Sequence, residues 1–420
     1  MEFNFNPGDY VKLRLALNEI EGRILESSDK SIILLKLNSG YNIGISKENI
    51  LAGRVLKKFK EEKEKREIQQ NEKLPKVGLV ITGGTIAAKL DSRTGAVHWL
   101  TDTNEFMKFY PEMLEMVNIK KIEVPFMTAS ESMTSEHWIK IAEAIKPMLD
   151  DSEIKGVIVT HGTDFLGYTG AALSFFLKNL NKPVVLTYSQ RSIDRASSDA
   201  DLNLQCAARM AISDAAEVML VGHANTNDDY CYALRGSKVK KLHSSRRDAF
   251  KPINTEAIAK VYPDKVEFLS QYKPRNEEKT ELDVSFSDKV ALVKFYPGQD
   301  PSILDFYALK YKGIVIEVAG LGHLPVSETE HNWVPTLKRH IKNGLIVCAA
   351  SQTIYGRLDP LVYSNGRELI DAGVIFLEDM LAETALVKLG FLLGHFGWKQ
   401  NIKEKMLENL AGELNERLSE

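Results

Sequence analysis

The sequence predicts an α/β protein in which two α/β domains follow a small β-barrel domain. Apolar runs that end in turns alternate with helix-like stretches over most of the chain. Strands that are apolar at nearly every residue are typical of a mostly parallel sheet covered on both faces. Residues 1–56 differ, with short β-rich runs separated by polar turns at roughly 8–12-residue spacing, which predicts the barrel. The alternative is a β-extension that packs on the next domain.

A charged segment at residues 57–75 is expected to link this domain to the rest. Lys57–Lys73 contains helix-favouring residues of both charge signs and little apolar face, and Leu74-Pro75 closes it. We predict a solvated helix or spacer supported by charge pairs four residues apart. The mixed signs argue against a nucleic-acid-binding tail.

Residues 76–275 are predicted to form the larger α/β domain and residues 276–420 the smaller one. A polar stretch at 273–288 separates the two patterns. A helix is expected at 168–180. A C-terminal helix is also expected, with a one-sided apolar stripe that favours domain core over a partner site: Ile402, Met406, Leu407, Leu410, Leu414 and Leu418. The predicted strands are 77–81, 156–160, 183–188 and 217–221 in the larger domain, and 290–296, 313–319, 344–350 and 373–377 in the smaller.

Composition excludes several classes of protein. With 420 residues, 44% hydrophobic and 26% charged, the chain is neither disordered, collagen-like nor a disulfide miniprotein. Its start lacks the features of a secretory signal, and no apolar run approaches the roughly 20 residues of a membrane span. The net charge of −3 gives no global reason to bind nucleic acid or an anionic membrane.

The cysteine and histidine patterns suggest a cytoplasmic protein without a metal site. Cys206, Cys231 and Cys348 are odd in number and far apart, and no Cys-x-x-Cys or His-Glu-x-x-His occurs. We therefore predict no disulfide framework and no structural metal, and a reducing cytosol fits best.

The first chemical motif is Thr82-Gly83-Gly84-Thr85, directly after the first predicted α/β strand. Ligands of open parallel sheets bind beyond the carboxyl ends of strands. Two glycines let the backbone turn sharply and approach a ligand closely, which would present Thr85 at the strand end. The following residues fit neither a phosphate loop nor a dinucleotide fingerprint. An ordinary strand-to-loop turn is the alternative.

The second motif, Thr160-His161-Gly162-Thr163-Asp164, also ends a strand and opens a helix. Thr163 either caps that helix or offers a nucleophilic hydroxyl, which needs a neighbouring base. Asp164 could bind a substrate ammonium or orient that base. Residues 238–241 contain three lysines, and such a run is usually a solvated basic face. Alternatively, one of these lysines is buried in the site, where desolvation would lower its pKa and let it serve as the base for threonine. Composition alone leaves open which one.

These motifs resemble the L-asparaginase family. Val80–Ala87 is similar to its first signature and Thr160–Asp164 to its second, and the resemblance spans about residues 76–400. Other similar stretches, the last of them typical of the cytosolic type I branch, are Ser130–Thr134, Ser351–Gly356 and 365–380. The resemblance implies an asparaginase-like core of two α/β domains.

The resemblance also implies roles for single residues. Thr85 would be the primary nucleophile, attacking the side-chain amide carbon of the substrate. Thr163, Asp164 and Lys241 would form a set that activates water or the nucleophile. Lys241 is chosen because Gly236 and the residues after it register best with the family's lysine segment.

Substrate binding is implied for a further pair of residues. Ser130 and Glu131 would hold the α-carboxylate and α-amino groups, with Asp164 sharing the ammonium. Main-chain amides near the two threonines would form the oxyanion hole. One departure from the family is the loop at residues 89–98, which lacks the tyrosine that normally activates the first threonine. An amidohydrolase without this group is expected to stay idle until its site is completed.

The β-rich domain and charged linker resemble a narrower family, the D subunits of archaeal Glu-tRNA(Gln) amidotransferases. Thr94–Val97 and Ser189–Ser192 resemble this family too. The resemblance implies glutamine hydrolysis that supplies ammonia to an E subunit, a homodimer of this chain within a heterotetramer, and tRNA(Gln) bound mainly by that partner. Nothing in the chain looks able to bind ATP, so no cofactor is expected here, and the partner would use ATP and Mg²⁺.

Two alternatives remain for the function. One is a free cytosolic L-asparaginase whose N-terminal domain serves dimerisation or regulation. The other is a non-enzymatic tRNA-binding module with an inactive amidohydrolase fold, against which the intact Thr85, Thr163, Asp164 and Lys241 argue.

Overall fold

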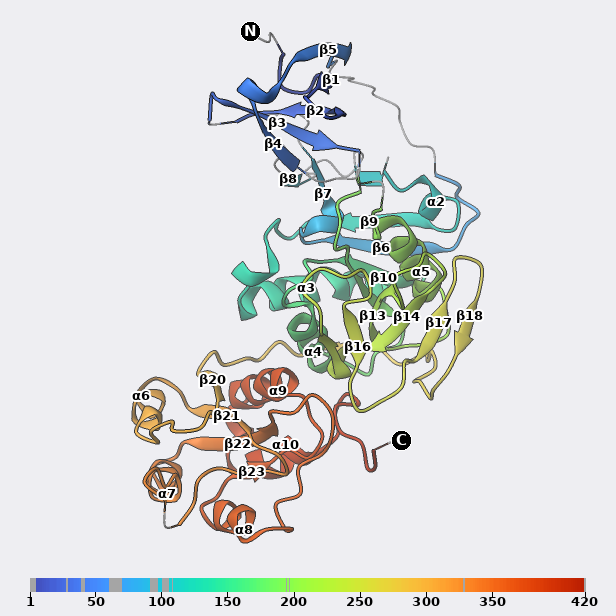
Figure 1. Ribbon diagram of the computed structural model, residues 1–420. Coiled ribbons are helices and arrows are strands. Elements are labelled where there is room, and N and C mark those ends of the chain that lie inside the picture. Colours follow the sequence, from blue (N-terminus) through green and yellow to red (C-terminus); the bar gives the residue numbers. More distant parts are fainter. Residues whose placement is uncertain are drawn as a thin grey trace.

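The computed structural model describes residues 5–27, 29–38, 42–59, 70–90, 97–99, 106–107, 109–193, 195, 197–327 and 329–418. Figure 1 shows an all-β domain, a large α/β domain and a smaller α/β domain stacked in chain order. The predicted fold class is confirmed. Residues 60–69 of the expected linker lie outside the described residues. Across the described ranges, no helix has the length and apolar character needed to cross a lipid bilayer.

The N-terminal domain is one antiparallel sheet in the order β4-β3-β2-β1-β5. Alternating residues of its strands, such as Val11 and Leu13, are fully buried and form a small core of their own. Almost all side chains of the last strand, β5, are exposed, so no alternation of apolar and polar residues marks it in the sequence. The elements are β1 (Tyr10–Arg14), β2 (Glu19–Leu25), β3 (Ile32–Leu37), β4 (Asn42–Ser46), η1 (Lys47–Asn49) and β5 (Ala52–Lys57).

The large domain is built on a mixed sheet in the order β18-β17-β14-β13-β12-β10-β6-β9. Neighbouring strands from β13 to β9 are parallel, and β14, β17 and β18 pair antiparallel at the other edge. All four predicted strands are present. The strands are β6 (Lys76–Ile81), β9 (Asn118–Glu123), β10 (Ile154–Thr160), β12 (Val184–Thr187), β13 (Val218–His223), β14 (Cys231–Arg235), β17 (Ala259–Val261) and β18 (Val266–Phe268).

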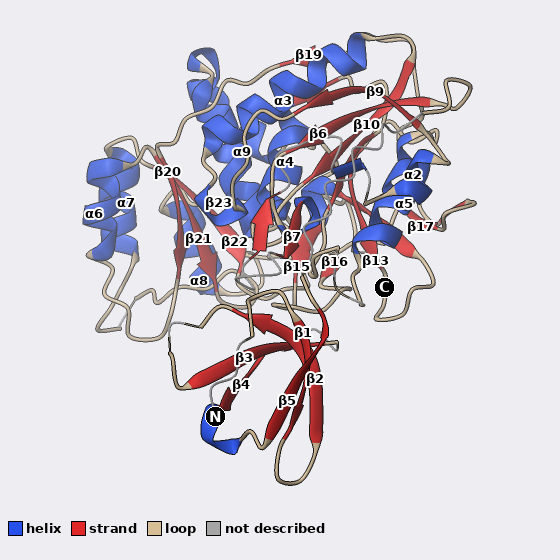
Figure 2. Cartoon of the chain, turned by 90° about the horizontal axis from the view of Figure 1, so that it is seen from above, coloured by secondary structure: helices blue, strands red, loops and turns tan. Residues whose placement is uncertain are grey.

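Helices cover both faces of this sheet, as Figure 2 shows. α3 (Ser135–Asp150) and α4 (Leu166–Phe176) pack on one face, and α2 (Pro111–Leu114) and α5 (Ala200–Ala211) on the other. The predicted helix 168–180 was placed too late. It ends at Phe176 because β11 (Leu177–Lys178) pairs with β19 (Glu281–Leu282) and Asn179 takes a φ of 52°.

The smaller domain has a parallel sheet in the order β20-β21-β22-β23, which confirms the predicted strands. One face packs against α6, α7 and α8, and the other against α9, which also packs on α4 of the large domain. The elements are β20 (Val290–Lys294), α6 (Ile303–Lys310), β21 (Gly313–Val318), α7 (Val334–Lys342), β22 (Ile346–Ser351), α8 (Ser364–Asp371), β23 (Ile375–Phe376), α9 (Ala382–Gly394), η5 (Phe396–Asn401) and α10 (Ile402–Leu407).

The predicted C-terminal helix is shorter than its apolar stripe. α10 stops at Leu407, because the Glu413 carboxylate accepts the backbone N–H groups of Leu410 and Ala411, and Gly412 takes a φ of 74°. Most of the stripe is nevertheless core. Ile402, Met406 and Leu414 are buried, Leu407 and Leu410 pack against the same cluster, and Leu418 is exposed.

Candidate active site

The first motif forms a tight loop at the carboxyl end of β6. Gly83 and Gly84 take φ angles of 113° and 77°. A Cβ on Gly83 would lie 2.5 Å from the Thr128 carbonyl oxygen, and one on Gly84 2.5 Å from the Gly162 nitrogen. The glycines are thus needed for close contact with other loops of the chain. They place Thr85, half-buried, at the start of η2 (Thr85–Ala87).

The second motif forms the neighbouring loop, at the carboxyl end of β10. His161 is fully buried, donates from Nδ1 to the Gly162 carbonyl at 2.7 Å and accepts the Thr169 hydroxyl at Nε2 at 2.9 Å. Burial lowers the pKa of His161 to about 4, so its ring is neutral at physiological pH and holds the loop. Thr163 is buried and Asp164 is exposed.

Thr163 does not cap the helix that follows, so that alternative is wrong. The N-cap residue of α4 is Phe165, and it makes no side-chain capping bond. The Thr163 hydroxyl instead lies 2.8 Å from Lys241 Nζ. The same nitrogen donates to Asp164 Oδ1 at 2.8 Å. A hydroxyl, a carboxylate and an amine therefore meet in one hydrogen-bonded group.

The three lysines of residues 238–241 have three different partners. They lie on η4 (Gly236–Lys238) and on β15 (Val239–Lys241), which pairs with β16 (Phe250–Pro252). Lys238 forms a buried ion pair with Asp379, and Lys240 pairs with Glu383. Burial lowers the pKa of Lys238, the most deeply buried of the three, whereas Lys241 is the lysine whose nitrogen contacts Thr163.

Ser130 lies next to the second motif, and Glu131 lies at the surface beside it. Both belong to η3 (Ser130–Ser132). The buried Ser130 hydroxyl accepts the Phe165 backbone N–H at 3.4 Å, and a Cβ on Gly162 would lie 3.0 Å from the same oxygen. Glu131 is exposed. Ser130 is thus in contact with the loop that carries Thr163 and Asp164.

The loop without the tyrosine joins β7 (Ala88–Leu90) to β8 (Val97–Trp99), which pair antiparallel. Residues 91–96 lie outside the described residues. The expected effect of the missing tyrosine therefore stays a prediction from the sequence.

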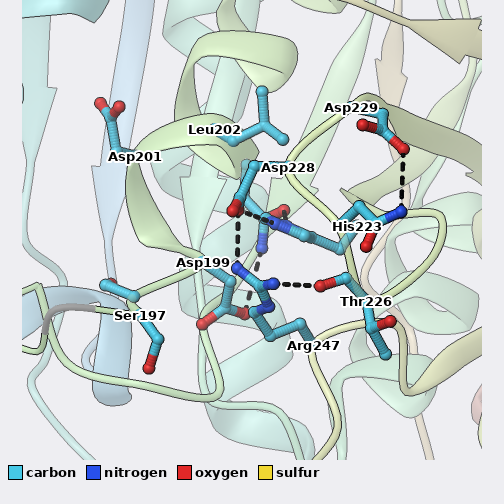
Figure 3. A network of polar contacts seen from close by, with 12 residues as sticks. Ser197, Asp199, Asp201, Leu202, His223, Thr226, Asp228, Asp229 and Arg247 are labelled. Carbon is cyan, nitrogen blue, oxygen red and sulfur yellow. Dashed lines mark hydrogen bonds and ion pairs between the residues drawn. The ribbon is translucent and has the colours of Figure 1, made fainter. Parts of the chain in front are cut away.

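A second polar network, which the sequence patterns did not predict, lies at the carboxyl ends of β12 and β13 (Figure 3). The buried His223 ring contacts Asn203 Oδ1 through Nδ1 at 2.6 Å and Asp228 Oδ1 through Nε2 at 3.0 Å. Arg247 donates to the same Asp228 oxygen at 2.6 Å. His223 ends an apolar strand, as Thr160 of the second motif does, and this was the signal that could have revealed it.

The same network fixes the loop after β12. The buried Asp199 carboxylate accepts the backbone N–H groups of Gln190 and Arg191 and, at 3.4 Å, the Asn203 amide. Burial raises the pKa of Asp199, although the two backbone donors oppose this shift. Asp199 thereby fixes the loop after β12, which lies at the same end of the sheet as the two motifs.

Sequence models of known families match nearly the whole chain. The family "Asparaginase, N-terminal" matches residues 76–274, and "Glutaminase/Asparaginase C-terminal domain" matches residues 289–406. The "GatD N-terminal domain" matches residues 5–56.

Curated relatives extend the similarity over nearly the full length of the chain. The D subunit of glutamyl-tRNA(Gln) amidotransferase from Pyrococcus furiosus is 47% identical over 97% of this chain and 94% of its own. The Thermococcus kodakarensis protein of the same name is 50% identical over 93% of this chain and 88% of its own.

Solved structures cover less of the chain. The thermostable L-asparaginase of Thermococcus kodakarensis has a TM-score of 0.72 and 29% identity, covering 81% of this chain and 100% of its own. L-asparaginase I of Vibrio cholerae has a TM-score of 0.69 and 27% identity, covering 81% and 99%. A whole asparaginase thus matches only part of this chain, and the GatD N-terminal domain match accounts for much of the remainder.

Proposed function

This chain belongs to the asparaginase-like D subunits of glutamyl-tRNA(Gln) amidotransferase, and we propose that it hydrolyses glutamine to supply ammonia to a partner protein. The partner, an E subunit, would activate Glu-tRNA(Gln) with ATP and Mg²⁺ and amidate it to Gln-tRNA(Gln). Free ammonia is mostly protonated at neutral pH and then has no nucleophilic lone pair. Ammonia is therefore best produced only when it is needed and close to the Glu-tRNA(Gln) that accepts it.

The observation that carries this proposal is the contact of Lys241 Nζ with both Thr163 Oγ1 and Asp164 Oδ1 at 2.8 Å. A threonine hydroxyl becomes a useful nucleophile or proton relay only beside a base, and a partly buried lysine can act as that base when neutral. Lys241 has 13% of its side chain exposed, whereas Asp164 is open to solvent and available to substrate.

The proposed reaction proceeds in two acyl-transfer steps. Thr85 Oγ1 attacks the side-chain amide carbon of glutamine and passes its proton through Thr163 to Lys241, which accepts it as the neutral amine. The carbon–nitrogen bond breaks as the nitrogen takes that proton back from Lys241 through Thr163, and ammonia leaves, so that an ester joins glutamate to Thr85. Water then attacks that ester and gives one proton to the same relay, which returns it to Thr85 Oγ1 as the ester bond breaks and glutamate is released. Direct attack by water would use the same Thr163–Lys241 relay.

Charge and exposure support the proposed substrate contacts. Asp164 and Glu131 present exposed carboxylates that suit the α-ammonium of glutamine. Ser130 offers a hydroxyl for the α-carboxylate, from a buried position beside Gly162. Backbone N–H groups of the two threonine loops would stabilise the oxyanion that forms during attack.

The proposed assembly extends the family assignment. We propose a homodimer of this chain within a heterotetramer in the cytoplasm, without membrane attachment, that binds tRNA(Gln) mainly through the partner. The near-neutral net charge of −3 supports this division, because phosphate binding requires a concentration of lysine and arginine.

The experiment is an amidation assay of the complex with Glu-tRNA(Gln). Thr85→Ala and Thr163→Ala should each abolish Gln-tRNA(Gln) formation from glutamine and leave its formation from added ammonium intact. Retention of glutamine-dependent amidation by both variants would contradict the assignment of these threonines.

The likeness to complete L-asparaginases favours one alternative, a free enzyme that hydrolyses asparagine. Activity of the purified chain without partner or tRNA separates the two functions. Rapid asparagine hydrolysis by the chain alone would favour the free enzyme, and glutamine hydrolysis that requires the partner would favour the amidotransferase component.

A further inference from the structure

The segment that precedes Lys241 is attached to the smaller domain at three points. The Thr384 hydroxyl donates to the Ser237 carbonyl at 2.8 Å. Lys238 pairs with Asp379, and Lys240 with Glu383. All three partners lie at or just before the first turn of α9, so the start of this helix holds residues 237–240.

Helix α9 also supports the other half of the catalytic group. Its residue Phe391 packs against Phe175 and Phe176 of α4, with ring centroids 6.0 Å apart in both pairs. Thr163 and Asp164 immediately precede α4. Helix α9 therefore contacts both the segment that carries Lys241 and the helix that follows Thr163 and Asp164.

The two oxygens of the Glu383 carboxylate have different surroundings. Its Oε1 pairs with Lys240, but its buried Oε2 has no hydrogen-bond partner. Burial raises the pKa of nearby Glu317, and repulsion from Glu383 adds to this shift, against the opposing effect of Lys294 and Lys240. An unsatisfied buried carboxylate oxygen is costly and calls for an explanation other than stability.

We propose that Glu383 is a positioning residue, which holds Lys240 against α9 and thereby keeps Lys241 in contact with Thr163. Side chains alternate across a strand, so the Lys240 and Lys241 side chains leave β15 on opposite sides. Anchoring one ammonium to the smaller domain fixes the direction of the next. Since β15 is three residues long, its pairing with β16 alone offers little restraint. This inference rests on the proposed role of Lys241.

The test is a double-mutant cycle in the full-length chain with its partner protein and Glu-tRNA(Gln), with glutamate release from glutamine as the readout. Glu383→Gln and Lys240→Ala should each lower kcat about 10- to 100-fold, the effect expected of a misplacement near 1 Å, with little change in KM. The double variant should lose no more than either single variant, because both changes remove the same contact. The pH profile of kcat should shift in the same direction in the two single variants and in the double variant.

The matched control is Glu267→Ala, which breaks the exposed Lys265–Glu267 pair, 2.5 Å long, at the far edge of the large sheet. It should leave kcat unchanged. Thermal unfolding of every variant identifies any that fail to fold, and in that case Glu383→Asp, which keeps the charge, should retain more activity than Glu383→Gln.

Lys241→Ala, measured in parallel, separates this inference from the proposed function. An inactive Lys241→Ala together with wild-type kcat in Glu383→Gln would overturn the positioning role alone. Additive losses in the double variant would also overturn it, because Glu383 would then act other than through Lys240. Full activity in Lys241→Ala would overturn the proposed function and, with it, the basis for this role.

Discussion

Lys241 and Thr163 lie 78 positions apart in the sequence, yet Nζ of one is 2.8 Å from Oγ1 of the other. The contact joins the loop after β10 to the strand β15, and it distinguishes Lys241 from the two other lysines of its segment. The neighbouring Lys238 is more deeply buried, but its partner is Asp379.

This difference predicts separate effects for two lysine substitutions. Lys241→Ala should lower kcat for glutamine hydrolysis by about 10²- to 10⁴-fold, the usual contribution of a general base, with little loss of stability. Lys238→Ala leaves Asp379 buried without its countercharge and should lower the free energy of unfolding by about 3–5 kcal/mol. Steady-state kinetics and urea unfolding of both variants check this, and a stable, fully active Lys241→Ala would contradict it.

The contact between the loop of Thr82–Thr85 and the loop of Thr160–Asp164 predicts that Gly84 tolerates no side chain. Gly84→Ala combines a strained φ of 77° with a Cβ placed 2.5 Å from the Gly162 backbone. It should displace Thr85 and lower both the melting temperature and kcat. Gly344→Ala is the control, because its φ is 95° but nothing lies within 4 Å of the added Cβ. If both variants lost activity equally, backbone strain rather than loop contact would be the cause.

Much of this arrangement could be predicted from the sequence, because it follows from local patterns. The apolar runs at 77–81 and 156–160 are strands, and the glycine and threonine motifs lie at their carboxyl ends. Contacts between distant segments could not be read in this way. The ion pairs of Lys238 and Lys240 involve residues more than 140 positions away, and nothing local marks Asp379 or Glu383.

Local signals also failed where tertiary contacts override them. The apolar stripe at 402–418 has helical periodicity, yet the chain leaves the helix after Leu407. There Glu413 binds the backbone of Leu410 and Ala411 and forms a buried ion pair with Lys388. Side-chain periodicity carries no information about such a pair.

The network of Figure 3 predicts that Asn203 is essential for stability. Its amide donates to the Tyr188 carbonyl at 2.8 Å, and its oxygen accepts from His223. Asn203→Leu leaves both buried groups unpaired and should lower the free energy of unfolding by about 2–6 kcal/mol, since each unsatisfied buried group costs about 1–3 kcal/mol.

Denaturant unfolding measures this effect. Thr226→Ala, at an exposed position in the loop after β13, is the control and should change the free energy by less than about 0.5 kcal/mol. A loss no larger in Asn203→Leu than in this control would show that the network contributes little.

His161 predicts a defined loss of stability in acid. Burial lowers its pKa from 6.5 to about 4, so the unfolded chain binds a proton below pH 6.5 that the folded chain does not. The stability that His161 contributes is therefore complete above pH 6.5 and is lost as the pH falls toward 4, by about 3 kcal/mol in total. His161→Asn removes this titration while other acid effects remain. The difference in unfolding free energy between wild type and variant, measured in urea from pH 7 to pH 4, should shrink by that amount. A constant difference would mean that the His161 ring takes up its proton in the folded state as readily as in the unfolded state.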